Sequence, residues 1–344
     1  MFDAIMSSAG ELLSAAFGPS SWVHPIYVLA MLPIGYFIYL RRRPEAGFWS
    51  WFLPREIMFH PSHLVTFQLF CVNVGLKLTG VFNMAVVKVL VFALVFGLLG
   101  GELTQRDPTM ISLWWMTLIF FLSTDFSAYC VHRLFHEVKL IWAFHAVHHS
   151  VEVLTPLAVY RTHPISQFIN GTFHAMISGT VLAFVFAFIA PSVSLIEIAG
   201  VSVLFYLFNI LGASFRHSHI WISFGPILGR FVVSPAFHQI HHSTDFKHWN
   251  KNYGNMLSVW DWMFGTMYLP KEEEILQFGL SYPDGNRIPQ PHPTFAKALW
   301  GPFRDSFHYF HSGRDPAYPE QDAAVDGAVD GAVDGAVDKV VTVK

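Results

Sequence analysis

The sequence is poor in charged residues, and this scarcity excludes several classes of protein. Of its 344 residues only 13% are charged, whereas 53% are hydrophobic and 16% are aromatic. Soluble domains carry about a quarter charged residues, so the composition favours a chain embedded in a lipid bilayer. The formal net charge of −3 is too small to indicate nucleic acid or another strongly charged partner.

Cysteine is almost absent as well. Cys71 and Cys130 are the only two, and both lie in apolar stretches, which argues against a disulfide framework and against a thiolate metal site. The first apolar stretch is not preceded by basic residues, and the start of the chain contains Asp3 and Glu11. The N-terminus therefore does not resemble a secretory signal peptide.

The short motifs of several enzyme classes are also missing. The sequence has no dinucleotide-binding glycine loop, no phosphate-binding loop, no serine nucleophile elbow and no HExxH motif of zinc proteases. No cofactor-binding domain is visible either. Oxygen chemistry in this chain would therefore need electrons from a separate protein.

Long apolar runs are what the sequence does contain. Each has about the twenty residues that cross a hydrocarbon core, and they cover residues 23–40, 82–99, 111–130, 172–190 and 193–212. The shorter run 64–76 predicts an interfacial or re-entrant helix, and a further crossing there is the alternative. We therefore expect an all-α, multi-pass membrane protein with five principal crossings or insertions.

The triple arginine at 41–43 follows the first run and, by the positive-inside rule, lies in the cytoplasm. This topology predicts a histidine-rich helical cap on the cytoplasmic side of a bacterial inner membrane, or of the endoplasmic reticulum in a eukaryote. We expect a membrane region at 1–110, a catalytic domain at 111–310 and a disordered tail at 311–344. The tail contains a four-residue repeat from Ala324 to Asp338.

Eight of the nineteen histidines fall in three clusters, an HxxxH motif followed by two HxxHH motifs. Their members are His132 and His136; His145, His148 and His149; and His238, His241 and His242. Residues i, i+3 and i+4 share one helical face, so each cluster can direct two or three imidazoles at a common point. Chance supplies only about 0.06 HxxHH matches in such a chain, which favours metal ligation.

Eight histidines exceed the needs of one metal ion. A zinc ion takes three or four protein ligands, so two metals with four or five imidazoles each fit the count better. His217 and His219 are further candidate ligands, because they return to the same side after the last apolar run. Imidazole binds iron, zinc, copper and nickel, so the spacing alone does not name the metal.

Three other residues are expected to support ligands without binding metal. Asp125 lies inside an apolar run, where a carboxylate is costly unless paired, and we expect it to orient an imidazole; helix packing is the alternative. His163 and His248 are expected nearby, although His163 could instead face lipid head groups. The histidines without paired spacing are interpreted as structural or interfacial: His24, His60, His63, His174, His292, His308 and His311.

The order of the three motifs resembles the fatty acid hydroxylase/sterol desaturase superfamily of membrane enzymes. The resemblance covers about residues 111–268 and includes Asp125, the Asn252-Tyr253-Gly254 sequence and the stretch 260–266. Asn250 departs from the pattern, since many members have an acidic residue there.

This resemblance implies a cytoplasmic di-iron centre that activates O2 and acts on a membrane lipid such as an acyl chain, a lipid head group or a sterol. It further implies hydroxylation or, as an alternative, desaturation, with a separate electron-donor protein. The ligands that it implies are His132, His136, His145, His148, His149, His217, His238, His241 and His242.

Two other functions compete with this interpretation. A membrane zinc hydrolase would lack the glutamate base of the HExxH type, and it would not need so many histidines. A metal transporter would place its ligands near mid-membrane, whereas these histidines are predicted at one face. The identity of the lipid stays open.

Overall fold

The computed structural model describes residues 2–18, 21, 24–101, 113–188 and 195–313. Every named element in these ranges is helical, and two isolated β-bridges join Ser243 to Phe278 and Ser281 to Arg287. The all-α prediction is therefore confirmed for the described part of the chain. The predicted outer segment at 102–110 and the repeat in the tail lie outside these residues, so they stay predictions.

The helices follow one another along the chain without long irregular connections until the C-terminal third. They are α1 (Phe2–Phe17), α2 (Pro25–Arg42), α3 (Phe48–Phe52), α4 (Arg55–Met58), α5 (Ser62–Leu78), α6 (Ala85–Leu98), α7 (Leu113–Glu137), α8 (Lys139–His149), η2 (Pro156–Tyr160), α9 (Pro164–Phe188), α10 (Leu195–Ile210), η3 (Ala213–His217), α11 (Gly225–Leu228), α12 (Pro235–His241), η4 (Phe246–His248), α13 (Val259–Met263) and α14 (Phe295–Ser312).

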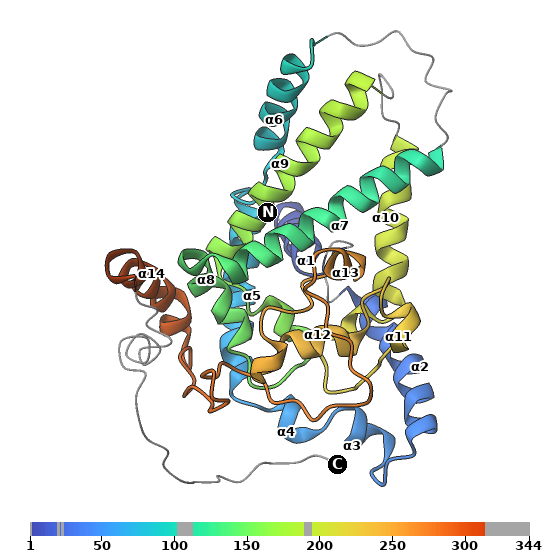
Figure 1. Cartoon of the computed structure of the whole chain (residues 1–344), viewed down its shortest axis with the longest axis vertical. Coiled ribbons are helices and arrows are strands. Elements are labelled where there is room, and N and C mark those ends of the chain that lie inside the picture. The colour runs from blue at the N-terminus through green and yellow to red at the C-terminus, as the bar shows by residue number, and fades with distance from the viewer. Residues whose placement is uncertain (1, 19–20, 22–23, 102–112, 189–194, 314–344) are drawn as a thin grey trace.

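The long helices and the short ones occupy different parts of the molecule. Figure 1 shows α6, α7, α9 and α10 in its upper half, while α8, α12 and the α2–α4 region lie below. Helix α9 packs against both α6 and α7, and α7 packs against α10 and α8. The C-terminal end of α7 therefore reaches the junction between the two parts, where the histidine motifs lie.

A sharp corner between α7 and α8 brings the first two histidine motifs together. Helix α7 continues past the predicted apolar run and includes His132 and His136, and it ends at Glu137. Val138 then adopts an extended conformation (φ −99°, ψ 102°) and precedes α8. Since the two helices pack against each other, the histidines of α7 and α8 face a shared space.

Helix α8 is held in place by a small apolar core beneath it. Val65 and Leu69 of α5, Val147 of α8 and Ala298 of α14 pack together, and none is more than 3% exposed. Burial of a valine or leucine side chain stabilises a fold by about 1.5–3 kcal/mol. The run 64–76, predicted as an interfacial helix, thus supports the histidine-bearing helix directly.

Helix α9 begins eight residues earlier than the predicted run 172–190. Its first residue is Pro164, which suits the first helical turn because its missing N–H has no partner there. The first two turns contain Ser166, Gln167 and Asn170, which interrupt the apolar pattern. Hydropathy alone therefore placed the start of this helix too late.

Among the described helices, α9 alone is long and apolar enough to cross a membrane by length and composition. A buried helix of a soluble protein passes the same test, so this is weak support. Helix α6 is apolar but has 14 residues, fewer than the predicted run 82–99. Five crossings therefore remain a prediction.

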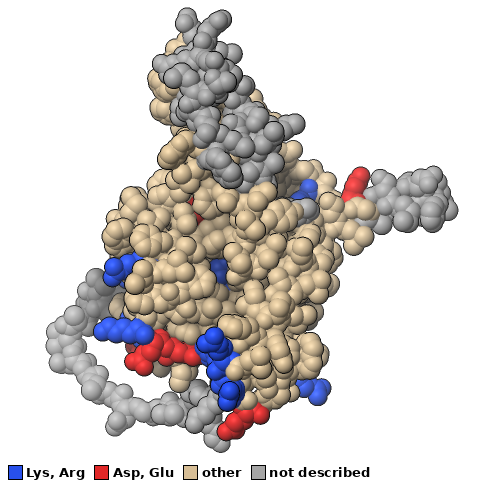
Figure 2. All heavy atoms as spheres, turned by 90° about the vertical axis from the view of Figure 1, so that its right-hand side faces the viewer, with Lys and Arg blue, Asp and Glu red and all other residues tan. Residues whose placement is uncertain are grey.

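Charged side chains gather away from the long apolar helices. Most of those visible in Figure 2 lie in the lower part of the molecule. At this end Arg42 forms an ion pair with Glu273 at 2.9 Å and also donates to the carbonyl oxygen of Trp221. The predicted cytoplasmic arginines thus lie on a polar end of the structure.

Candidate metal centre

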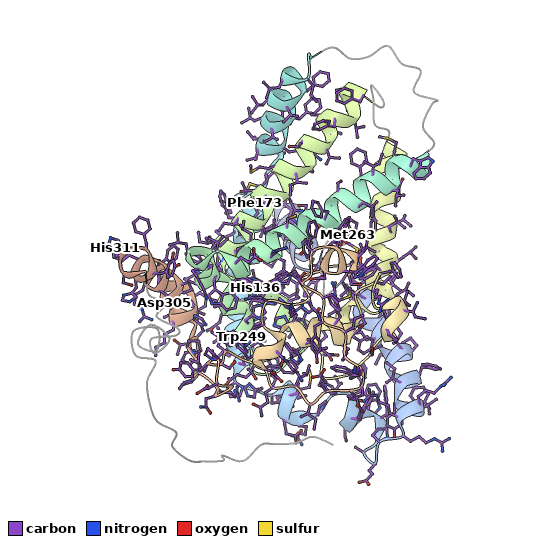
Figure 3. All side chains as sticks on the ribbon, viewed as in Figure 1. His136, Phe173, Trp249, Met263, Asp305 and His311 are labelled. Carbon is purple, nitrogen blue, oxygen red and sulfur yellow. The ribbon has the colours of Figure 1, made fainter. Side chains whose placement is uncertain are left out.

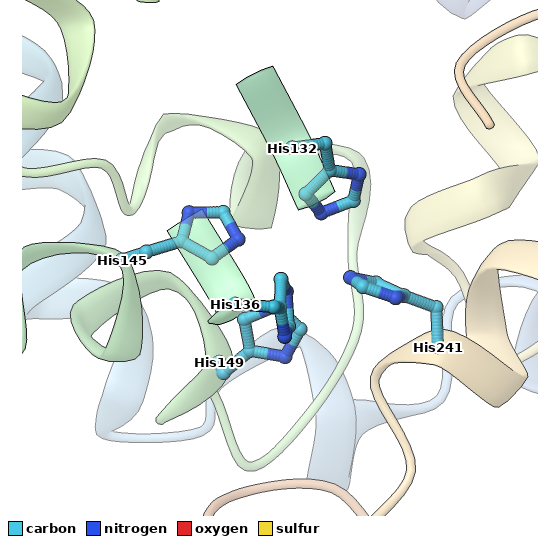
Figure 4. Close-up of side chains that lie close together, drawn as sticks. All are labelled: His132, His136, His145, His149 and His241. Carbon is cyan, nitrogen blue, oxygen red and sulfur yellow. The ribbon is translucent and has the colours of Figure 1, made fainter. Parts of the chain in front are cut away.

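The structure gathers nine histidines into two adjacent groups. The first group consists of His132, His136, His145, His149 and His241. The second group consists of His148, His217, His238 and His242. Within each group the ligand nitrogens all lie within 4.8 Å of one another. Figure 4 shows the rings of the first group turned toward a common centre, and Figure 3 places His136 in the interior of the molecule.

Each HxxHH motif contributes to both groups, in a reciprocal way. On α8 the i,i+4 pair His145 and His149 joins the first group, while His148 joins the second. On the α12 motif the i,i+4 pair His238 and His242 joins the second group, while His241 joins the first. Because i and i+4 share a face and i+3 is rotated from it, each short motif links the two groups.

The spacing of the second group matches that of ligands around one ion. The Nε2 atom of His217 lies 3.4 Å from that of His148 and 3.1 Å from that of His238, and His242 Nε2 lies 3.2 Å from His238 Nε2. Two nitrogens at 2.0–2.1 Å from a metal, separated by 90–109°, would be about 2.9–3.4 Å apart. The donor set and its spacing therefore fit a bound metal ion.

The first group contains buried nitrogens that lack hydrogen bonds. The Nε2 atoms of His136, His145, His149 and His241 are buried without a partner. A buried polar atom without a hydrogen bond costs about 1–3 kcal/mol. A metal ion at the centre of the group would satisfy all four at once, so these residues also fit such an ion.

The protonation state of the rings suits metal binding. Burial lowers the pKa of His132 to about 4 and that of His148 to about 3. Burial, followed by repulsion from neighbouring imidazoles, holds the pKa of His136 and His242 well below the usual value. The rings are therefore neutral at pH 7, and each keeps a nitrogen lone pair for a metal.

Backbone carbonyls orient two of the rings in the first group. His132 donates from Nδ1 to the carbonyl oxygen of Tyr253 at 2.9 Å, and His241 donates from Nδ1 to that of Lys251 at 2.8 Å. These bonds fix the tautomer that leaves the Nε2 lone pair free for a ligand. The sequence analysis noted the Asn252-Tyr253-Gly254 sequence but assigned it no role.

The loop that supplies these carbonyls is itself fixed by Asp261. Its carboxylate accepts hydrogen bonds from the backbone N–H groups of Tyr253 and Gly254 at 2.8 and 2.7 Å, and from the hydroxyl of Thr266. Asn252 adopts a left-handed conformation (φ +63°), which asparagine tolerates better than most residues. Asp261 thus positions a ligand-orienting carbonyl without contacting a ligand.

Asp125 has a related structural role. It accepts hydrogen bonds from the N–H groups of Met256 and Leu257 and from the indole of Trp260, at 2.9–3.0 Å. These bonds join α7 to the same loop. The expected contact between Asp125 and an imidazole is not what the structure shows.

The remaining candidate histidines lie outside both groups. His219 hydrogen-bonds the carbonyl oxygen of Trp51 through Nε2 at 2.8 Å, so the structure does not bring this predicted ligand to the centre. His163 hydrogen-bonds the carbonyl oxygen of Leu299 and accepts from the N–H of Ile165 at the start of α9. His248 lies 3.3 Å from the carboxylate of Glu274.

A cavity of about 770 Å³ reaches both groups of histidines. Five histidines line it, namely His132 and His145 of the first group and His148, His217 and His238 of the second. Ligand cavities in proteins typically have volumes of about 300–1,000 Å³. A substrate in this cavity would therefore contact both candidate metal sites.

Comparison with known proteins identifies the part of the chain that carries the two groups. Residues 117–266 match the family model described as fatty acid hydroxylase. Alkylglycerol monooxygenase of Xenopus tropicalis is 33% identical over 170 residues, which cover 49% of this chain and 33% of that protein. No solved structure matches the chain.

Two relatives with other printed activities match the same part of the chain. Ornithine lipid hydroxylase of Rhizobium tropici is 30% identical over 46% of this chain and 43% of that protein. The putative Delta(7)-sterol-C5(6)-desaturase 2 of Arabidopsis thaliana is 29% identical over 45% of this chain and 49% of that protein. The chain thus spans about a third to a half of the length of these relatives. Residues 117–266, which contain all nine grouped histidines, belong to the fatty acid hydroxylase family.

Proposed function

We propose that this chain is a membrane-bound di-iron oxygenase that hydroxylates a lipid at the cytoplasmic face of a membrane. The observation that carries this proposal is the division of nine histidines into two adjacent groups of five and four. Two groups of this size provide for two metal ions, and the cavity beside them provides room for a substrate.

The donor set favours iron over a hydrolytic zinc centre. Each group among the described residues consists of imidazoles alone, without a carboxylate that could act as a general base. A catalytic zinc ion usually has three protein ligands and an open position, whereas the first group offers five. Imidazole is a suitable ligand for iron.

The protein would hold the metals and place the substrate. When bound, the iron pair would supply the oxidising power that O2 needs to attack an unactivated C–H bond. His132 and His241 would keep their ligand geometry through the Tyr253 and Lys251 carbonyls. The cavity walls would hold the target carbon beside both sites, since positioning governs which bond reacts.

Exposed apolar surface supports membrane association. Helix α6 has no buried residue in this structure, and its exposed side chains include Val86, Leu90, Leu94 and Leu98, which are 64–79% exposed. Contiguous apolar surface of this kind marks an interaction site, and lipid is the partner that matches it. Together with α9, it suits a site whose lipid substrate enters from the bilayer.

Desaturation is the second candidate reaction. A sterol desaturase is among the relatives, and the same histidine groups would serve both reactions. The outcome depends on whether oxygen is returned to the carbon or a second hydrogen is removed, which substrate placement decides.

Labelled O2 and lipid mass spectrometry test this function. Cells that express the wild type should contain a lipid that carries one labelled oxygen, and cells that express His148→Ala at equal level should not. A lipid that loses two hydrogens without label would establish desaturation instead. Identical lipid spectra for the two proteins in several lipid backgrounds would reject the oxygenase.

A further inference from the structure

The cavity beside the histidines has a second wall that is polar. On α9 the residues that line it recur on one helical face; they are Ser166, Gln167, Asn170, Gly171 and His174. Polar groups in a membrane-associated helix are costly unless they face a polar partner. This stripe begins in the two turns of α9 that interrupt its apolar pattern, so the interruption coincides with the cavity.

Two buried atoms on this wall lack a hydrogen-bond partner. Asn73 of α5 is 5% exposed; its Nδ2 donates to the carbonyl oxygen of Thr162 at 2.8 Å, but its Oδ1 has no partner. Ser166 is 2% exposed, and its Oγ has no partner. Both residues line the cavity. An amide oxygen only accepts hydrogen bonds, so the missing partner of Asn73 must be an O–H or N–H group.

The polar wall lies close to the first histidine group. The Nδ1 atom of His174 is 2.6 Å from the hydroxyl oxygen of Ser127, which joins α9 to α7. Ser127 precedes His132 by five residues, which corresponds to about 7.5 Å along the helix axis. A molecule bound on the wall therefore has its nearest carbons within a few bonds of the histidines.

Asn73 is linked in the same way to the second group. Thr162, which it binds, follows Arg161, and Arg161 donates from Nε to the carbonyl oxygen of Val147 at 3.0 Å. Val147 immediately precedes His148. The polar wall and both histidine groups are thus parts of one rigidly connected cavity.

We propose that this wall binds a hydroxyl or amide N–H in the head group of the lipid substrate. The oxidised carbon then lies near the head group rather than far along a hydrocarbon chain. No carboxylate is present among the described residues that line the cavity, so a cationic head group has no ionic partner there. The substrate class is therefore a lipid with a neutral hydrogen-bond-donating head; the inference rests on the proposed function only in assigning this lipid as the substrate.

Anaerobic binding to the purified, metal-containing full chain tests the proposal without turnover. One probe is a long-chain monoglyceride with two free hydroxyls, and the other is the same molecule with both hydroxyls methylated. The wild type should bind the first about tenfold more tightly, as expected for one or two hydrogen bonds. Ser166→Ala and Asn73→Leu should each reduce this ratio to about twofold or less.

Thr180→Val is the matched control on the same helix. Its hydroxyl bonds to the carbonyl oxygen of Met176 and does not line the cavity, so the tenfold ratio should persist. Ser166→Ala decides the test if Asn73→Leu fails to fold, because the serine hydroxyl holds no other group. Equal affinity of the wild type for both probes, or an unchanged ratio in Ser166→Ala, would overturn the proposal.

The binding test and the labelled O2 test fail separately. A tenfold ratio without labelled product would reject the oxygenase and retain the polar wall as a lipid site. Labelled product with a ratio of one would reject the polar wall and retain the oxygenase.

Discussion

His217 and His219 are separated by one residue, yet their imidazoles have different surroundings. His217 lies among the Nε2 atoms of the second group, 3.1 Å from that of His238, whereas His219 is bound to the carbonyl oxygen of Trp51. The sequence treated both as candidate ligands because nothing in their spacing separates them. The 3₁₀ turn η3 ends at His217 and the chain then becomes extended at Ser218, which directs the two side chains differently.

This difference predicts different metal contents for two matched variants. His217→Ala should lower the metal content of the purified protein from two ions per chain toward one, because the second group loses one of four ligands. His219→Ala should retain two. Elemental analysis of both proteins measures this, and an equal loss in the two variants would contradict the assignment.

Asp261 offers a test at a residue that contacts no ligand. Asp261→Asn replaces one carboxylate oxygen with an N–H donor that faces the backbone N–H groups of Tyr253 or Gly254. The Tyr253 carbonyl should then hold His132 less firmly, and metal affinity should fall about 10–100-fold.

Competition with a chelator of known affinity measures this change. Lys251→Ala is the control for Asp261→Asn, because the carbonyl that binds His241 belongs to the backbone and survives the substitution. Metal affinity that is unchanged in Asp261→Asn would show that the loop does not orient His132.

At the scale of the helices, α6 and α9 pack closely where α9 has a glycine. A Cβ atom at Gly179 would lie 2.6 Å from the backbone oxygen of Lys88 and 3.3 Å from the backbone nitrogen of Phe92. Small residues allow such close approach between helices in membranes. This contact fixes α6 against the helix that forms the polar wall.

Gly179→Val should therefore destabilise the protein by about 1–3 kcal/mol, the usual cost of forcing extra methyl groups into a packed interface. Gly97→Ala on α6 is the control, since a Cβ there meets nothing within 4 Å. Thermal unfolding of both variants in one detergent measures the effect. Equal midpoints would show that α6 and α9 do not pack as described.

Helix boundaries show what hydropathy could and could not predict. The apolar run 111–130 correctly indicated a helix, and the i,i+4 spacing of His132 and His136 suggested a helical continuation, as α7 has it. The start of α9 was missed because its first turns face a polar cavity rather than lipid. A polar residue in a helix can reflect a site as well as a helix end, and single-sequence periodicity does not separate them.

At the scale of the whole molecule, the buried imidazoles predict how stability depends on pH. Burial lowers the pKa of His132 from 6.5 to about 4 and that of His148 from 6.5 to about 3 in the folded chain. Below pH 6.5 the unfolded chain binds protons at these residues and the folded chain does not. This contribution to stability is therefore complete above pH 6.5 and is lost as the pH falls toward 4 and 3.

The metal-free protein should accordingly lose stability steadily between pH 6.5 and 4. Denaturant unfolding of chelator-treated protein at several pH values measures this, with the metal-containing protein at pH 7 as the reference for a folded site. Stability that is constant or rises over this interval would contradict the burial of these rings.

The assembly of the site shows where the sequence reaches its limit. The motifs predicted which histidines share a helical face, because that depends on spacing within a few residues. The allocation of His148 to one group and His145 to the other depends on where α12 lies, about ninety residues later in the chain. Likewise, the carbonyls of Lys251 and Tyr253 could not be predicted, since every residue carries a carbonyl and only the fold selects two of them.

The central claim is that the nine grouped histidines hold two iron ions in each chain. Its most direct test is the metal content of the full chain purified from cells supplied with both iron and zinc. The account predicts about two iron ions per chain, falling toward one in His217→Ala. One zinc ion per chain, or no metal that depends on these histidines, would contradict it.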